Sequence, residues 1–144
     1  MEIEIRSPKT KEEWETYYSL RYRILREPWN QPPGSERNEG DETAIHTALF
    51  ENGKILGVSR LDSAEQEIGQ IRFMAVETNQ QGKGIGEQLM HQLELIALQR
   101  GHKKIILHAR EIAIGFYQKL GYELKEKSHL LFGEIQHFLM EKQL

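Results

Sequence analysis

The segment from Ile71 to Gly86 constrains the fold of this chain more than any other part of the sequence. Residues 71–76 read Ile-Arg-Phe-Met-Ala-Val, residues 77–80 are polar, and residues 81–86 read Gln-Gly-Lys-Gly-Ile-Gly. This order predicts an apolar strand, a short turn and a glycine-rich loop that opens a long helix. The first turn of a helix leaves backbone N–H groups without partners and carries partial positive charge. Because glycine has no Cβ, a phosphate or pyrophosphate can approach these groups closely and is the expected ligand.

The spacing of the glycines excludes two common phosphate-binding motifs. A dinucleotide-binding fingerprint beginning at Gly82 and Gly84 would need a third glycine at position 87, which is Glu87. A P-loop needs Ser or Thr after a Gly-Lys pair, and neither pair in this chain, at 53–54 or 82–83, has one. A Gln-x-x-Gly-x-Gly pattern directly after a Met-Ala-Val strand remains. The alternative is a glycine-softened turn that binds nothing.

The pattern over residues 81–86 resembles the coenzyme A pyrophosphate loop of the GCN5-related N-acetyltransferase (GNAT) family. A second segment, residues 110–122, reads Arg-Glu-Ile-Ala-Ile-Gly-Phe-Tyr-Gln-Lys-Leu-Gly-Tyr and resembles the family's Asn-x-x-Ala-x-x-Phe-Tyr-x-Lys-x-Gly-Phe segment. Both motifs stand in the family's order and spacing, and the resemblance covers nearly the whole chain. In detail the chain is most similar to the ElaA-like branch, on residues 20–26, Asp41 and Glu42 with His46, residues 107–110, and residues 137–140.

Length and composition fit a single globular domain over residues 1–144. The formal net charge of −3 gives no broad attraction to nucleic acid, so no nucleic-acid partner is expected. The absence of cysteine excludes disulfides, thiolate metal sites and a cysteine nucleophile. Residues 1–6 read as a short alternating strand rather than a signal peptide, and no apolar run approaches membrane-spanning length. We therefore expect a cytoplasmic protein with no membrane partner.

Hydrophobic periodicity predicts the order strand, helix, three strands, helix, strand, helix and closing strands. The expected strands are residues 3–5, 44–51, 54–61, 66–76, 104–108, 122–124, 130–132 and 135–140. The expected helices are residues 10–26, 82–100 and 111–120, and residues 28–40 are expected to form a loop. This order predicts an α/β fold (α+β mixed sheet) with a central mixed sheet and helices on both faces. The family resemblance implies that the strands at 66–76 and 104–108 splay apart and admit the cofactor.

The resemblance implies that acetyl-CoA binds as the acyl donor. The backbone of residues 74–76 would hydrogen-bond the pantetheine arm, and the amides of residues 81–86 would hold the pyrophosphate. Arg110 stands where the family often has Asn, so it either reaches the cofactor or is a surface charge. The residues expected to contact the cofactor are Met74, Ala75, Val76, Gln81, Gly82, Lys83, Gly84, Ile85, Gly86, Arg110, Phe116 and Tyr117.

Forming an amide from a thioester requires a neutral amine, a polarised carbonyl and a proton for the departing thiolate. Tyr117 matches the family tyrosine that lies near the cofactor sulfur, which implies that it is the general acid; a purely packing role is the alternative. Without cysteine, direct attack by the amine is favoured over a covalent relay. The general base stays open among His108, Glu42, His46 and Glu134, or a water chain, although histidine is well suited to accept a proton near neutrality.

The acceptor is expected to be a primary amine on a small molecule or a peptide. Acidic residues in the loop 36–42 could attract a cationic amine, and Arg72 could point into the acceptor pocket. Trp29, Tyr22 and Phe132 are aromatic candidates for its lining, although core packing is the commoner fate of such residues. His91, His102, His129 and His137 lack the spacing of metal ligands, so no metal is expected.

Two other functions remain open: a non-catalytic acyl-CoA-binding regulatory module, and an acyltransferase that uses longer acyl groups. Members of the resembled family are often dimers, so a homodimer is a further option.

Overall fold

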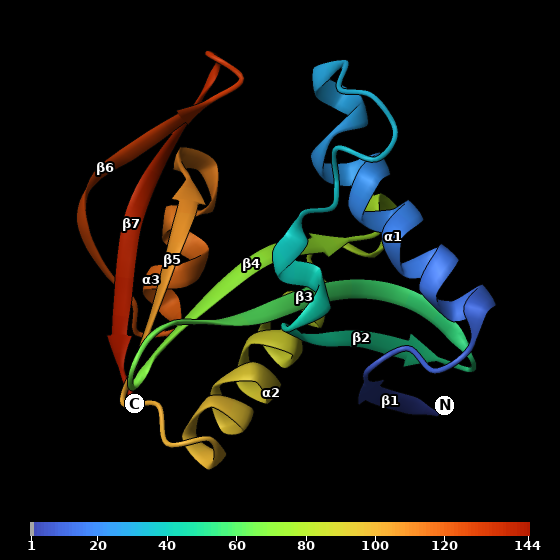
Figure 1. The fold of residues 1–144 in the computed structure, drawn as a ribbon, viewed down its shortest axis with the longest axis horizontal. Helices are drawn as coiled ribbons and strands as arrows, with labels where there is room; N and C mark the ends of the chain where they lie inside the picture. The colour runs from blue at the N-terminus through green and yellow to red at the C-terminus, as the bar shows by residue number, and fades with distance from the viewer. Residues whose placement is uncertain (1) are drawn as a thin grey trace.

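The computed structural model describes residues 2–144, which form one seven-stranded sheet with helices on both faces (Figure 1). The strand order is β1-β2-β3-β4-β5-β7-β6. The strands are β1 Ile3–Arg6, β2 Ile45–Glu51, β3 Lys54–Glu65, β4 Ile68–Val76, β5 Lys104–Arg110, β6 Glu123–Leu131 and β7 Ile135–Gln143. The α-helices are α1 Lys11–Leu25, α2 Ile85–Gln99 and α3 Ile114–Lys119, and the 3-10 helices are η1 Glu27–Trp29, η2 Glu39–Glu42, η3 Thr78–Gln80 and η4 Glu111–Ala113.

The sheet is mixed because β4 and β5 run parallel, whereas every other neighbouring pair is antiparallel. α1 packs on one face, where Tyr17 and Leu20 meet Phe50 and Val58 in one buried cluster. α2 packs on the opposite face. Because the side chains of a strand alternate between the two faces, each strand can contribute to the core on both sides. The predicted mixed sheet with helices on both faces is confirmed.

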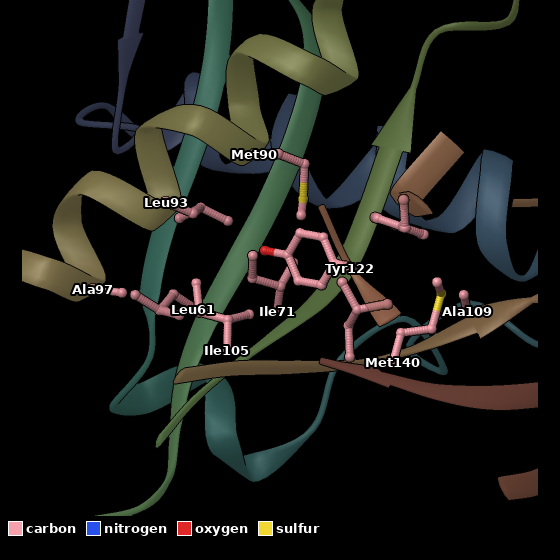
Figure 2. Packing of buried hydrophobic residues seen from close by; sticks show 11 residues of the cluster. Leu61, Ile71, Met90, Leu93, Ala97, Ile105, Ala109, Tyr122 and Met140 are labelled. Atoms are coloured by element: carbon pink, nitrogen blue, oxygen red, sulfur yellow. The ribbon is translucent and has the colours of Figure 1, made fainter. Parts of the chain in front are cut away.

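The larger core cluster lies between the sheet and α2 together with α3 (Figure 2). Met90 and Leu93 of α2 are fully buried against Ile105 of β5 and Met140 of β7. In Figure 2 the ring of Tyr122 lies among these side chains, and its hydroxyl donates to Glu94 Oε2 at 2.8 Å. This cluster fixes α2 and α3 on the same face of the sheet, next to the strands β4 and β5.

A capping box starts α1. The Thr10 side chain accepts from the Glu13 N–H at 3.1 Å, and the Glu13 carboxylate accepts from the Thr10 N–H at 3.4 Å. Each contact satisfies a backbone donor that the helix leaves free. The Asn52-Gly53 turn, with φ of 51° and 81°, joins β2 to β3, as this dipeptide favours.

Several element boundaries differ from the sequence prediction: β3, β5 and β7 extend to Glu65, Arg110 and Gln143, and the helix expected at 111–120 divides into η4 and α3. Three further differences have a local cause. α2 begins at Ile85 rather than at position 82. Gly84 has a left-handed φ of 83°, which is not helical, and it occupies the N-cap position just before the helix. β4 begins at Ile68 rather than at position 66, because Glu67 turns with φ of 69° between β3 and β4. The two short strands expected at 122–124 and 130–132 are instead the single strand β6, since β7 pairs with it from Glu123 to Leu131.

A buried ionic network joins α1 to the loop that follows it. Arg21, which is 0% exposed, donates to Asp41 Oδ1 at 2.9 Å, and Arg60 of β3 donates to the same oxygen at 3.0 Å. Tyr17 O–H accepts from Arg21 Nη2 at 3.1 Å and lies 2.8 Å from His46 Nδ1. The loop between α1 and β2, which follows one rim of the candidate site, is therefore anchored to the sheet.

Candidate functional site

The strands β4 and β5 pair along only part of their length. The pairing runs from Ile68 opposite Lys104 to Ile71 opposite Leu107, whereas β4 continues to Val76 and β5 to Arg110. In Figure 1 the two strands diverge beyond this point. The splay that the family resemblance implied is therefore present.

A bulge in β4 sits where the two strands part. Opposite β3, the pairs Val58–Ala75 and Arg60–Arg72 leave one extra residue on β4 between them. Phe73, at this bulge, has the left-handed φ of 54° that non-glycine residues rarely adopt. A bulge bends its strand and increases the local twist, so it turns the end of β4 away from β5.

The gap opens into a cleft of about 430 Å³ between the sheet, the end of α1, α3 and the β6–β7 hairpin. Of the predicted site residues, Met74, His108, Arg110 and Tyr117 line it. The remaining lining residues are Leu25, Arg26, Trp29, Gln70, Ile71, Arg72, Phe73, Leu107, Ala109, Ala113, His129, Leu131, Ile135 and His137.

Tyr117 of α3 lines the cleft from the face of the sheet that α2 and α3 cover. Its side chain is 8% exposed and belongs to the core under β5, next to Tyr122. Burial raises the pKa of Tyr117 to about 12, and the nearby Arg110 only partly opposes this shift. The phenol therefore keeps its proton throughout the neutral range and is available as a proton donor in the cleft.

His108 of β5 enters the cleft from the opposite face to Tyr117, because Leu107 and Ala109 on either side of it belong to the core cluster under α2 and α3. Its Nδ1 lies 2.9 Å from Ser128 Oγ of β6. Burial lowers the pKa of His108, and the neighbouring His129 and Arg72 lower it further. The imidazole is thus neutral at pH 7 and able to accept a proton.

The glycine-rich loop lies outside the cleft, at the start of α2. Gly82 and Gly84 have φ of 82° and 83°, and at neither would a Cβ meet a heavy atom within 4 Å. Gln81 Nε2 donates to the Val76 carbonyl oxygen at 3.2 Å, which ties the loop to the end of β4. Because Gly84 has no side chain with which to cap α2, the amides of the first helical turn stay open to an anion.

α3 links this loop to the cleft. A Cβ on Gly86 would lie 3.2 Å from Phe116 Cζ, so the Phe116 ring packs directly on the helix start. The Phe116 ring is in turn 5.0 Å from the Tyr117 ring, edge to face. A ligand that bound the loop and followed β4 would therefore come to Tyr117.

The other proposed bases do not line the cleft. His46 is buried beneath α1, where its Nε2 lies 2.8 Å from the Asp41 carbonyl oxygen and can only donate to it. Burial lowers the pKa of His46, and its Nδ1 lies 2.8 Å from the hydroxyl oxygen of Tyr17, which donates to the Ser59 carbonyl oxygen at 3.0 Å. Glu42 belongs to η2 and Glu134 to the β6–β7 turn, and neither contacts the cleft.

The acidic loop also turns away from the cleft. Glu36 is 4% exposed, and its carboxylate accepts from the Gly34 N–H and from Arg37. Asp41 is held by Arg21 and Arg60 as described above. Glu36 and Asp41 thus serve buried and loop contacts, whereas Glu39 and Glu42 are exposed, and none of residues 36–42 lines the cleft. The expectation that this loop attracts a cationic amine stays a prediction.

Several cleft residues carried no local signal in the sequence. Arg26 ends α1, and His129 and His137 stack with ring centroids 4.4 Å apart across β6 and β7. Only strand pairing brings these two histidines together, so their spacing in the sequence gives no sign of the contact. Of the aromatic candidates, Trp29 lines the cleft, whereas the Tyr22 hydroxyl donates to the Gln31 carbonyl oxygen.

Within residues 2–144, no three His, Asp or Glu side chains gather closely enough to hold a metal ion. Over the same residues no helix combines the length and the hydrophobicity that crossing a membrane would need.

Comparisons with known proteins agree with this geometry. A family model described as the acetyltransferase (GNAT) family matches residues 11–122. The Bacillus subtilis (strain 168) protein named "Uncharacterized N-acetyltransferase YjcF" is 25% identical over 134 residues, which cover 93% of this chain and 95% of that protein.

Two solved structures share the fold. An aminoglycoside 6'-N-acetyltransferase complexed with coenzyme A has a TM-score of 0.83 at 18% identity, covering 99% of this chain and 97% of that one. Escherichia coli ElaA has a TM-score of 0.81 at 19% identity, covering 98% of each chain. At these identities the likeness establishes the common fold.

Proposed function

The chain belongs to the acetyltransferase (GNAT) family, and we propose that it transfers an acetyl group from acetyl-CoA to a primary amine by direct attack. The observation that carries the proposal is the succession of open amides at the start of α2, an end of β4 that has no strand partner on the β5 side, and Tyr117 in the cleft. Phosphate, an extended amide-containing arm and a thioester would occupy these three places in that order.

The donor is held mainly by backbone groups in this proposal. The amides of residues 82–86 bind the pyrophosphate, with Gln81 and Lys83 beside it. Beyond Ile71 the edge of β4 that faces β5 has no strand partner, so Met74, Ala75 and Val76 offer hydrogen bonds to the pantetheine arm. Arg110, at the end of β5, completes the cofactor contacts from the other strand.

The reaction needs one bond to form and one to break. The amine nitrogen attacks the thioester carbonyl carbon, and the resulting tetrahedral species loses the coenzyme A sulfur. Tyr117 gives its proton to that sulfur, so the thiol leaves neutral. The attacking nitrogen loses a proton to His108, directly or through water, and the products are an N-acetyl amine and free coenzyme A.

The first experiment is isothermal titration with acetyl-CoA, followed by a thiol-release screen over a panel of amines. Micromolar binding with thiol release for one amine class would support the transferase. Binding without any release would favour a regulatory acyl-CoA module. Faster release from longer acyl-CoA donors would indicate an acyltransferase that uses a longer acyl group than acetyl. No binding of acetyl-CoA would contradict the loop assignment.

A matched pair of glycine variants tests the pyrophosphate loop. Gly84 and Gly101 stand at opposite ends of α2, with φ of 83° and 86°, and a Cβ at either would have open space. Gly84→Val and Gly101→Val therefore carry the same backbone strain, but only the first places a side chain beside the open amides. We expect weaker acetyl-CoA binding in Gly84→Val alone, and equal affinities in both variants would refute the assignment.

A further inference from the structure

The charged groups that line the cleft are all basic. Among the lining residues within 2–144 are Arg26, Arg72 and Arg110, together with His108, His129 and His137, and no Asp or Glu is among them. An ordinary protonated amine would be repelled by such a surface. The cleft is thus electrostatically selective, independently of how the acetyl donor binds.

These basic groups lie on the face of the sheet opposite to the donor loop. Ile71, Leu107 and Ala109 point into the core under α2 and α3, so Arg72, His108 and Arg110, their neighbours along the strands, point to the face that α1 covers. Arg26 caps the end of α1 on that same side. The loop at 82–86 instead opens α2, on the other face. Apart from Arg110, which is proposed to reach the donor from the end of β5, the basic face is therefore left for the second substrate.

Like Arg110 at the end of β5, Arg72 is a cation of the cleft lining whose guanidinium makes no hydrogen bond within residues 2–144. Its side chain is 40% exposed, and its one ion-pair contact within residues 2–144 is a loose 3.9 Å to Asp62. Asp62 already accepts two hydrogen bonds from Arg60, at 2.6 and 2.7 Å. Burial, and then the charge of Arg60, lowers the pKa of Arg72, so the guanidinium is poorly compensated and an anion beside it would be stabilised.

Arg21, Arg60 and Arg26, which lie near Arg72, are less available. Arg21 and Arg60 are fully buried and share Asp41. Arg26 donates to the Ser35 and Leu25 carbonyl oxygens at 3.0 and 3.1 Å, which holds its guanidinium at the rim of the cleft. Arg26 and Arg72 both lie against the Phe73 ring, at 5.5 and 5.0 Å from its centroid. The bulge residue thus orients both cations toward one part of the cleft.

We propose that the acceptor is an amine that also carries an anionic group, a carboxylate or a phosphate, which pairs with Arg72 and is flanked by Arg26. This proposal rests on the transferase function proposed above and specifies its second substrate. An Arg guanidinium presents several donors in a planar fork that matches both kinds of anion.

The same charges help to prepare the nucleophile. A bound ammonium group surrounded by arginines has a lowered pKa, because a nearby like charge disfavours the protonated form. An anion fixed at Arg72 retains such a molecule in the cleft, while the remaining positive field favours its neutral amine. The same arginines therefore bind the anionic group of the acceptor and favour the neutral form of its amine. A weak base such as His108 is then sufficient to take up the proton.

Product analogues test the anion site without any turnover. The protein is saturated with coenzyme A and titrated with N-acetyl-L-amino acids and with the matching N-acetyl-L-amino acid amides, with ligand-detected NMR as the readout. N-acetyl-O-phosphoethanolamine and N-acetylethanolamine form the corresponding phosphate pair. We expect the anionic member of at least one pair to bind about ten- to hundredfold more tightly, as a charge-assisted hydrogen bond gives. Whichever pair shows the larger ratio identifies the anion.

Substitutions at Arg72 test whether the anion binds at one specific site or is attracted by the positive charge of the protein in general. Arg72→Gln should abolish the preference for the anionic probe, Arg72→Lys should retain part of it, and the acetyl-CoA affinity should stay unchanged in both. Arg100→Gln removes the same charge from an exposed position at the far end of α2 and should leave the preference intact. An anion preference that survives in Arg72→Gln, or equal binding of both members of every pair, would overturn the proposal.

Kinetics distinguish the failure of this proposal from the failure of the proposed function. Thiol release is measured with L-amino acids, their amides, O-phosphoethanolamine, ethanolamine and cationic diamines. A higher kcat/KM for anionic amines supports the inference, and a preference for neutral or cationic amines overturns it while leaving the transferase intact. No release from any amine, with acetyl-CoA still bound, contradicts the transferase instead, and the product-analogue titration then decides the anion site by itself.

Discussion

At the scale of single residues, the two groups proposed to move protons differ in how the fold treats them. Tyr117 is buried in the core under β5, which holds its pKa high and keeps the phenol protonated. His108 faces the opposite side of the sheet, where burial and positive neighbours hold its pKa low. Their environments push the two pKa values apart in the directions that an acid and a base need at neutral pH.

Tyr117→Phe removes the phenolic proton and leaves the ring in place. We expect kcat to fall by about 10²- to 10⁴-fold, the range for losing a general acid. Acetyl-CoA affinity, measured by titration calorimetry, should change little, because the donor is proposed to be held by the loop and β4. A variant with unchanged kcat would show that Tyr117 serves packing only.

The pH dependence of kcat tests His108. A general base works only when unprotonated, so activity should persist as the pH falls below 6.5, the ordinary value for histidine, and decline only through the lower pKa of His108. On the alkaline side Tyr117, with a pKa of about 12, should cause no decline below about pH 11. His108→Gln should lower kcat and remove the acid limb. An acid limb that persists unchanged in this variant would assign it to another group.

At the scale of elements, the position of α2 decides whether the donor loop is correctly placed. The helix begins beside Gly57 of β3, and it approaches the strand so closely that a Cβ at Gly57 would lie 2.7 Å from Ile85 Cγ2 and 3.0 Å from Leu89 Cδ1. Real Cβ atoms do not come so near, so this glycine sets the spacing between sheet and helix. The first turn of α2, whose amides are proposed to bind pyrophosphate, depends on that spacing.

Gly57→Ala should therefore push the start of α2 away from the sheet. We expect a loss of about 1–3 kcal/mol in the free energy of unfolding, as overpacking typically costs, together with weaker acetyl-CoA binding. Urea denaturation and calorimetry measure the two effects. Adding Ile85→Ala removes the closest contact, so the double variant should be less destabilised than the sum of the two single variants. Strict additivity would argue against this contact.

At the scale of the whole molecule, a buried network joins elements that are distant in the sequence. Asp41 of η2 accepts from Arg21 of α1 and from Arg60 of β3, and both arginines are at most 1% exposed. Charged groups are tolerated in such a place only when they are paired. The network therefore holds the loop between α1 and β2 against the sheet, alongside the basic cleft.

Asp41→Asn would leave these two arginines without their shared counter-charge. We expect a loss of about 3–5 kcal/mol in the free energy of unfolding, the range for breaking a buried ion pair from one side. Chemical denaturation measures it. Glu39→Gln, an exposed carboxylate in the same short helix, is the control and should change stability by less than about 0.5 kcal/mol. Equal effects of the two substitutions would show that the network adds no stability.

The sequence by itself determined the features that depend on neighbouring residues. The capping box at Thr10, the Asn52-Gly53 hairpin and the strand, glycine loop and helix between residues 71 and 86 all follow from local backbone preferences. These features were sufficient to indicate the family and the donor loop. The amphipathic stripe of α2 likewise predicted its buried face.

The tertiary structure alone decided the features that depend on pairing between distant segments. Pairing with β3 places the bulge at Phe73, the bulge parts β4 from β5, and the packing of α1 turns the acidic loop onto buried arginines. Basic side chains that are distant in the sequence thereby line one cleft, whereas the carboxylates near them are absent from its lining. No local pattern records this separation of charge, because it arises from which faces the strands present once the sheet has formed.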